Sequence, residues 1–224
     1  MRFRRLFRPR SDYLFGIASS LFAAFLFFAA LTPATARAEL SDQDRADLAR
    51  VEVFLNGIRS LQARFTQLSE AGGIAEGDFY MQRPGRLRFE YAPPSPILIV
   101  ATGRTLIFYD AELGQVSRLA LSATPLGFLV ADNFSFSGDF QVESVERQPG
   151  ALFIKVFDTR RPNEGSVIMV FADQPLQLRQ WQILDAQGKR TTIALFNVRT
   201  NLALDAELFR FVDPDPFGPL APPD

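Results

Sequence analysis

The stretch EGDFYMQRPGRLRFEYAPPSPILIVATGRTLIFYD, residues 76–110, decides the fold. It predicts four short strands joined by turns. The first strand, residues 77–82, is followed by Arg83-Pro84-Gly85-Arg86. Proline at the second position of a turn presets φ, and glycine at the third accepts a positive φ. We therefore expect a tight hairpin at this point.

The return strand alternates in a period of two. Leu87, Phe89 and Tyr91 share one face, and charged side chains occupy the other, as in a half-buried antiparallel strand. Three prolines within residues 93–96 end this strand. The next two strands, residues 97–100 and 106–109, are apolar on both faces.

Further strands are predicted on both sides of this stretch. One precedes it and one follows it, and five more fill the second half of the chain, which gives 11 strands in up-and-down order: residues 63–67, 115–119, 140–147, 152–156, 167–171, 178–184 and 191–198. An antiparallel sheet of that size either closes or curls.

Two helices accompany the strands. Ser41 begins a capping box, and apolar residues follow at helical spacing, so we expect an amphipathic helix over residues 42–60 that covers one face of the sheet. Thr124 as N-cap and Pro125 at the first helical position predict a second helix, kept short by Gly127. This short helix fits either a lid or an ordinary packing element.

The two ends of the chain differ in composition from its middle. Residues 1–38 combine early arginines, an apolar run and small residues, the pattern of a secretory signal peptide cleaved after Ala38 or Ala36. The alternative is an uncleaved membrane anchor. Residues 39–212 are expected to form one domain, and residues 213–224 a proline-rich tail.

Composition excludes several classes of function. Without residues 1–38 the chain keeps 18 basic and 24 acidic residues, a net charge of about −6, so nucleic acid is not an expected partner. Cysteine and histidine are both absent from the sequence. This removes disulfides, lipid attachment at a cysteine, Ser-His or Cys-His catalysis and the usual zinc ligands. We expect a periplasmic monomer without cofactor or metal.

The inner face of the curved sheet is rich in aromatic residues. If the helices cover one opening, this face can enclose space for an apolar ligand. Alternatively the same side chains pack on one another as a filled core, which the pattern alone favours, because apolar strand faces are mostly core. The residues concerned are Phe65, Phe79, Leu87, Phe89, Phe108 and Trp181.

A series of short motifs resembles the periplasmic outer-membrane lipoprotein carrier family, LolA. The motifs are Ala63-Arg64-Phe65-Thr66-Gln67, Gly77-Asp78-Phe79, Gln82-Arg83-Pro84-Gly85, Phe89-Glu90-Tyr91, Thr105-Leu106-Ile107-Phe108-Tyr109-Asp110, Thr124-Pro125 and Asp205-Ala206-Glu207-Leu208-Phe209-Arg210-Phe211. The resemblance implies an unclosed antiparallel β-barrel with helices as a lid over a hydrophobic cavity. It also implies a carrier that takes lipoproteins from an inner-membrane ABC-type exporter to an outer-membrane receptor.

The resemblance also assigns site residues. It implies that Arg83 bonds to backbone groups of the lid and keeps the empty cavity closed until acyl chains enter. Leu87 stands where one member of the family has an aromatic residue, at a position where contact with the exporter has been placed. The acyl-chain site would comprise Arg83, Phe65, Phe79, Leu87, Phe89, Tyr91, Phe108, Trp181, Leu126 and Leu129.

Two other functions remain open. One is a module of the same fold that senses lipids or lipoproteins, as in sigma-factor regulators, which are expected to carry a second domain. The other is a hydrolase that uses Asp78 and Glu90, although a pair of carboxylates on strand exteriors is more often solvent-exposed than catalytic.

Overall fold

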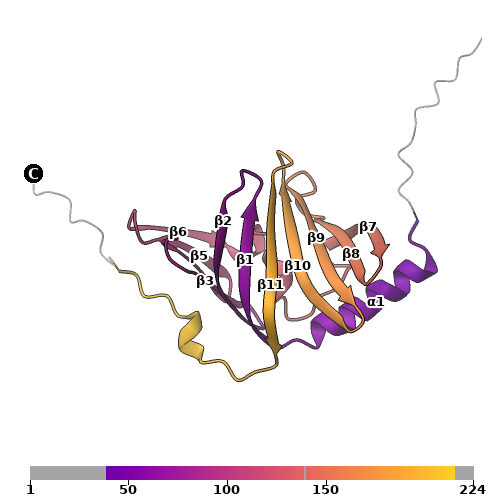
Figure 1. The fold of residues 1–224 in the computed structure, drawn as a ribbon, viewed down its shortest axis with the longest axis horizontal. Helices are drawn as coiled ribbons and strands as arrows, with labels where there is room; N and C mark the ends of the chain where they lie inside the picture. The colour runs from indigo at the N-terminus through magenta and orange to yellow at the C-terminus, as the bar shows by residue number, and fades with distance from the viewer. Residues whose placement is uncertain (1–38, 139, 215–224) are drawn as a thin grey trace, which may run out of the picture. The chain divides into compact units, whose positions relative to one another are not determined.

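The computed structural model describes residues 39–138 and 140–214. These residues form one antiparallel sheet of 11 strands with two α-helices and two short 3-10 helices (Figure 1). The strands are β1 (Ser60–Ser69), β2 (Ile74–Gln82), β3 (Arg86–Tyr91), β4 (Ile97–Thr102), β5 (Thr105–Asp110), β6 (Gln115–Ala120), β7 (Phe140–Gln148), β8 (Ala151–Asp158), β9 (Gly165–Asp173), β10 (Leu176–Asp185) and β11 (Arg190–Thr200). The predicted class, an unclosed antiparallel half-barrel of about 11 strands, is confirmed.

The opening of the half-barrel lies between β6 and β7. The strand order is β6-β5-β4-β3-β2-β1-β11-β10-β9-β8-β7, so the first and last strands pair in the centre of the sheet. The two edge strands are consecutive in the chain. Residues 121–138, which we call the lid segment, connect one edge of the sheet to the other and therefore cross the opening.

Helix α1 (Asp42–Asn56) begins as predicted and ends earlier. The Ser41 hydroxyl accepts from the backbone N–H of Asp44, and the Asp44 carboxylate accepts from the backbone N–H of Ser41, which completes the capping box. The prediction that the helix continues to residue 60 is wrong. It ends at Gly57, and Ser60 already pairs with Gln82 in the sheet. Pairing of Ser60 with the neighbouring strand β2 outweighs the local helical spacing.

Helix α1 covers one half of the concave side of the sheet. Leu48, Val51 and Leu55 are buried in the core, and Phe54 meets Phe171 edge-on at 6.1 Å between ring centroids. The predicted covering role is confirmed.

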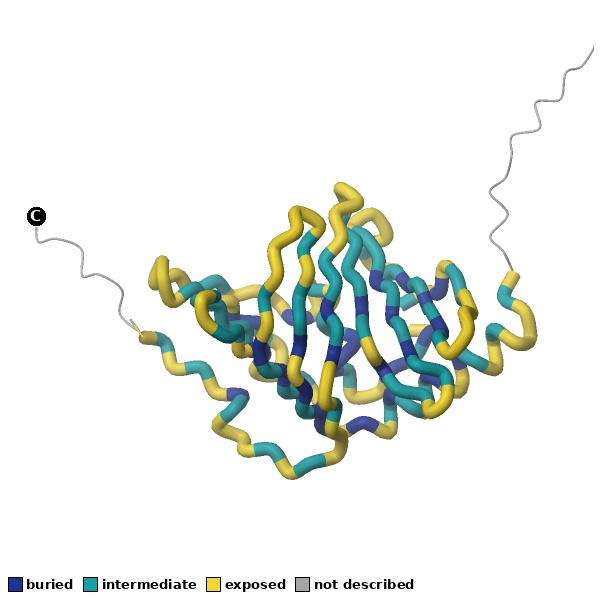
Figure 2. The backbone as a smooth tube through the Cα atoms, in the orientation of Figure 1, coloured by how far each residue is buried: buried dark blue, intermediate teal, exposed yellow. Residues whose placement is uncertain are grey.

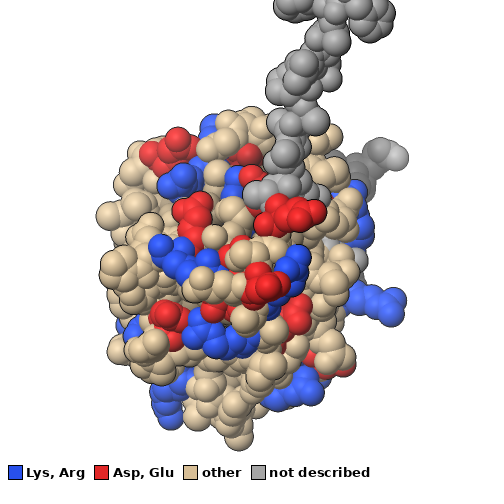
Figure 3. Space-filling view, turned by 90° about the vertical axis from the view of Figure 1, so that its right-hand side faces the viewer, with Lys and Arg blue, Asp and Glu red and all other residues tan. Residues whose placement is uncertain are grey.

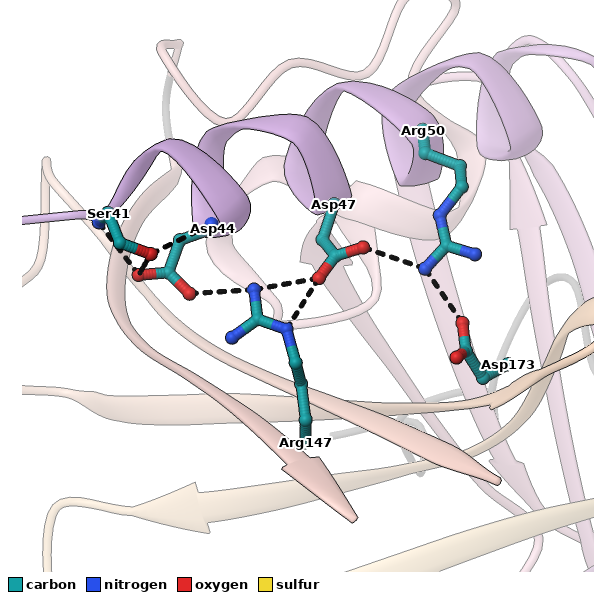
Figure 4. A network of polar contacts seen from close by, with 6 residues as sticks. All are labelled: Ser41, Asp44, Asp47, Arg50, Arg147 and Asp173. Atoms are coloured by element: carbon teal, nitrogen blue, oxygen red, sulfur yellow. Dashed lines mark hydrogen bonds and ion pairs between the residues drawn. The ribbon is translucent and has the colours of Figure 1, made fainter. Parts of the chain in front are cut away.

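A chain of ion pairs fixes the polar side of the helix (Figure 4). Arg147 of β7 bridges Asp44 and Asp47 at 2.8 and 2.7 Å, and Arg50 joins Asp47 to Asp173 at 2.7 Å. These contacts tie α1 to β7 and β9.

The short helix of the lid segment differs from its prediction. A 3-10 helix, η1 (Leu121–Ala123), comes first, and α2 (Gly127–Val130) follows. Thr124 ends η1, and its hydroxyl donates to the carbonyl of Leu121, so its predicted role as N-cap of an α-helix is wrong. Gly127, expected to weaken the helix, is its first residue. A helix of four residues has almost no intrinsic stability and depends on tertiary contacts.

The chain after β11 covers the outside of β3, β4 and β5. Its 3-10 helix η2 (Ala206–Phe209) places Phe209 in a buried position, and Val100 and Ile107 are buried apart from the main core. Phe211 lies 5.7 Å from Tyr109. This cover explains why β4 and β5 are apolar on both faces.

Buried positions concentrate in the middle of the strands, whereas the tips of the β1–β2 and β10–β11 hairpins are exposed (Figure 2).

The surface that carries α1 mixes acidic and basic side chains, with no large area of one sign (Figure 3). Within the described residues, no helix is both long and apolar enough to cross a bilayer. The predicted signal peptide, residues 1–38, lies outside the described residues.

Candidate functional site

The aromatic side chains of the inner face form one cluster. Inward-facing residues of β1, β2, β3 and β10 contribute Phe65, Phe79, Leu87, Phe89 and Trp181, each at most 3% exposed. Strand register places Phe79 opposite Phe89, with their rings stacked at 4.4 Å. Trp181 completes the cluster at 5.9 Å from Phe79 and 6.3 Å from Phe89. The sheet thus brings together five of the predicted site residues.

The other predicted apolar residues surround this cluster. Leu129 is buried in the hydrophobic core that contains this cluster, while Leu126 and Tyr91 are partly buried against that core. The hydroxyl of Tyr91 donates to Oε1 of Gln67 at 2.7 Å, and burial raises the pKa of Tyr91 to about 12, so this side chain stays neutral. Phe108 points to the same side from β5 but lies nearer the edge and is 37% exposed.

The rings of the aromatic cluster pack on one another in this conformation. A pocket of ≈ 90 Å³ lies below the start of the lid segment, where Pro125 faces Phe140 and Val156. It is smaller than the ~150 Å³ cavity that holds one benzene molecule in a protein core. A groove of ≈ 500 Å³ runs outside, between Gly85, Gly103 and the lid segment. A larger open groove of ≈ 810 Å³ lies between α1 and the end of the lid segment. None of these three spaces is lined by the aromatic cluster.

Arg83 joins the β2–β3 turn to the lid segment. It begins the β2–β3 turn, is 8% exposed, and its Nε donates to the backbone carbonyl of Leu129 at 2.9 Å. The adjacent Gly85 donates its backbone N–H to the carbonyl of Val130, also at 2.9 Å. We call these two bonds to α2 the latch. The turn fits because Gly85 adopts φ = 75°, and a Cβ there would lie 2.7 Å from the carbonyl oxygen of Gly103.

The electrostatic setting of Arg83 is unfavourable for a charge. Burial and the nearby positive charge of Arg59 lower the pKa of Arg83 to about 10, although Asp132 acts in the opposite direction. No ion pair joins Arg83 to a carboxylate among the residues that the structure describes, and its further partner is Oδ1 of Asn56 at 3.5 Å. The guanidinium is therefore buried on backbone and amide oxygens alone, which makes the latch weaker than a buried ion pair.

Four other side chains contact the lid segment elsewhere, and one of them, Arg59, pairs with Asp132 at 3.3 Å. Asn56 exchanges two hydrogen bonds with the backbone of Phe134, at 2.8 and 2.9 Å. Glu52 accepts from the backbone N–H of Phe136 at 2.6 Å. Arg161, which is also ion-paired with Asp158, donates to the carbonyl of Ser122. The segment is thus fastened to α1, to the β2–β3 turn and to the β8–β9 loop.

Sequence reasoning missed several of these residues. Glu52 and Asn56 are ordinary polar residues of a helix, and nothing in their spacing marks them as lid contacts. Phe128 is fully buried in α2, against Trp181 at 6.5 Å. The apolar run that follows Gly127 could have identified it as a lid residue that faces the interior.

Two further predictions concern Leu87 and the carboxylates Asp78 and Glu90. Leu87, aligned by the resemblance with an exporter contact, is 0% exposed and offers no surface to a partner in this conformation. Asp78 and Glu90 lie opposite each other on the outer face, with side chains 46% and 55% exposed. Arg64 and Arg88 pair with them, as expected of solvent-exposed carboxylates. Among the described residues, no group of His, Cys, Asp or Glu could hold a metal ion.

Comparison with known proteins identifies relatives over most of the chain. The family model described as outer membrane lipoprotein carrier protein LolA matches residues 56–212. The outer-membrane lipoprotein carrier protein of Methylococcus capsulatus is 32% identical over 78% of this chain and 87% of its own. The protein of the same name in Chromobacterium violaceum is 31% identical over 84% and 94%. The crystal structure of the LolA superfamily protein NE2245 from Nitrosomonas europaea superposes with a TM-score of 0.45 at 12% identity, over 73% of this chain and 97% of that one.

Proposed function

The chain belongs to the LolA family of outer membrane lipoprotein carrier proteins, and from this premise we propose how it carries its cargo. Acyl chains of a lipoprotein enter the space below the lid segment and are covered there. The carrier works in the periplasm after removal of a signal peptide. It receives lipoproteins from an inner-membrane ABC-type exporter and passes them to an outer-membrane receptor, and no catalytic step is involved.

The energetics of lipid anchors support a carrier. Exposing one acyl chain of ~15 methylenes to water costs on the order of 12 kcal/mol, at ~0.8 kcal/mol for each CH₂. A lipoprotein therefore cannot cross an aqueous compartment at a useful rate unless its chains are covered. A carrier must also release the load, which favours a cover held by a few hydrogen bonds over a deep rigid pocket.

The latch is the observation that carries this proposal. Two hydrogen bonds from Arg83 and Gly85 hold α2 above the aromatic cluster. When they break, α2 can lift away with Phe128 and Leu129, and apolar side chains become available to a ligand. Acyl chains then replace the contacts that α2 made. Closing the lid segment expels them again and restores the latch.

Transfer from detergent tests the proposal. Purified protein is mixed with an acylated lipoprotein in detergent, and the detergent is then removed. We expect a soluble one-to-one complex on size-exclusion chromatography. The control is the same lipoprotein without its lipid anchor, which should elute alone. Aggregation of the acylated lipoprotein despite an excess of the folded protein would contradict the proposed function.

A further inference from the structure

One polar atom of the aromatic cluster, the indole nitrogen of Trp181, is buried without a hydrogen-bond partner within the part of the chain that the structure describes. Trp181 of β10 is 0% exposed, and among the described residues its Nε1 is the buried side-chain nitrogen or oxygen that lacks a hydrogen-bond partner. A buried indole N–H usually finds an acceptor, because a donor taken out of water and left unpaired destabilises the conformation that contains it. The closed conformation therefore carries an unsatisfied donor at the centre of the sheet.

The surroundings of Trp181 do not explain why a donor stands there. Its neighbours across the strands are Met169 and Ile193, and the rings of Phe79 and Phe89 lie within 6.3 Å. These side chains offer apolar contact and no strong acceptor. A phenylalanine would make much the same contacts without burying an N–H group. The indole is consistent instead with a partner that arrives from outside.

The lid segment controls one side of the indole. The ring of Phe128 stands edge-on to Trp181 at 6.5 Å and an interplanar angle of 83°. Phe128 belongs to α2, whose next two carbonyl groups accept the latch bonds from Arg83 and Gly85. Opening of the latch therefore withdraws Phe128 from the indole. A ligand that fills the vacated space comes into contact with Trp181.

We propose that the N–H group of Trp181 donates a hydrogen bond to an ester carbonyl of the acyl-glycerol anchor in the loaded carrier. The inference rests on the proposed function and adds which chemical group of the lipid is recognised. Alkyl chains have no acceptor, whereas an ester carbonyl is a strong acceptor that enters together with apolar chains. The same N–H group destabilises the closed state and stabilises the loaded state, so it favours uptake in both ways.

A matched pair of lipids tests whether the ester carbonyl is recognised. The probes are dipalmitoylglycerol, which has two ester carbonyls, and the dialkyl ether of glycerol with chains of equal length, which has none. We expect the wild-type protein to bind the ester about fivefold to tenfold more tightly, the worth of one hydrogen bond in a dry site. Trp181 is the single tryptophan of the chain, so its emission reports on the site directly. The emission maximum should move to longer wavelength with the ester and not with the ether.

Two variants complete the test. Trp181→Phe removes the donor and should bind ester and ether equally. Phe89→Leu removes apolar contact without removing a donor, so it should weaken both probes and keep the preference for the ester.

The outcomes separate the two proposals. Equal affinity of the wild-type protein for both probes, with the same emission for each, overturns the role of Trp181 and leaves the proposed function standing. Binding of neither probe overturns both. If Trp181→Phe does not fold, the comparison of ester and ether in the wild-type protein decides the question by itself.

Discussion

Replacement of Arg83 by leucine separates the stability of the fold from the action of the latch. In the closed state Arg83 gives one hydrogen bond to Leu129 at 2.9 Å and is almost fully buried. Leucine fills part of the same space and has no donor. The hydrogen bond exists only when the lid segment is closed, so its loss weakens closure and leaves the sheet intact.

The magnitude follows from the setting of the guanidinium. Its pKa of about 10, against the usual 12.5, corresponds to a net penalty on the order of 3 kcal/mol for the charge in the folded state, caused mainly by burial and increased by Arg59. The lost hydrogen bond to a charged group is worth about 1.5–3 kcal/mol. These two effects nearly cancel in the free energy of unfolding, so Tm should change by less than ~6 °C. In the equilibrium between closed and open protein, only the hydrogen bond is lost. The ratio of closed to open protein should therefore fall about tenfold to 150-fold.

Release of cargo is the assay that detects this change. Arg83→Leu should take up an acylated lipoprotein and release it to acceptor membranes at least tenfold more slowly, because closing the lid segment no longer drives the chains out. Arg86→Leu is the matched control, since Arg86 follows the same turn as the first residue of β3, is exposed, and among the described residues its side chain bonds to Gln82. Normal release by a folded Arg83→Leu protein would refute the latch.

Two further predictions concern stability. Gly85→Ala should lower the free energy of unfolding by about 1–3 kcal/mol in denaturant titrations, because the new Cβ meets Gly103. The control is Gly114→Ala, which should lose at most about 1 kcal/mol, because Gly114 has φ = 62° but open space around it. Equal losses in the two variants would contradict the close approach of Gly85 to Gly103. Asp158 is disfavoured as an anion by its burial, but hydrogen bonds from Arg160 and Arg161 outweigh this and hold its pKa at about 2. Because the pKa is lower in the folded state, the contribution of Asp158, on the order of 1–2 kcal/mol, is complete above pH ~4 and is lost between pH ~4 and ~2. Asp158→Asn should remove this loss of stability between pH ~4 and ~2. An unchanged dependence of stability on pH would contradict the assigned interactions of Asp158 with Arg160 and Arg161.

The strands of residues 76–110 could be predicted because the sequence features that define them lie close together in the chain. Alternating apolar residues, the Pro84-Gly85 turn and the prolines after Tyr91 each act within a few residues of one another. The end of α1 could not be predicted in the same way. Residues that follow Gly57 keep a helical apolar spacing, yet they pair with β2, the next strand, and with β11, which lies far away in the sequence.

The same difference between local patterns and contacts from distant elements applies to the candidate site. The aromatic cluster was predictable, since its members occupy one face of successive strands. The contacts that fasten the lid segment were not, because Glu52, Asn56 and Arg161 come from distant elements and meet backbone groups that carry no sequence signal. Arg83 was assigned through the family resemblance, and the structure places it on a lid carbonyl.

The central claim is that the lid segment opens when cargo enters, and a distance measurement tests it most directly. The chain has no cysteine, so Arg86→Cys and Pro125→Cys, at exposed positions on the β2–β3 turn and the lid segment, allow two spin labels to be attached without background. Their separation is measured by double electron–electron resonance, with and without a bound acylated lipoprotein. We predict one short distance in the empty protein and a longer, broader distribution in the complex. A complex that forms with the distribution unchanged would contradict the claim.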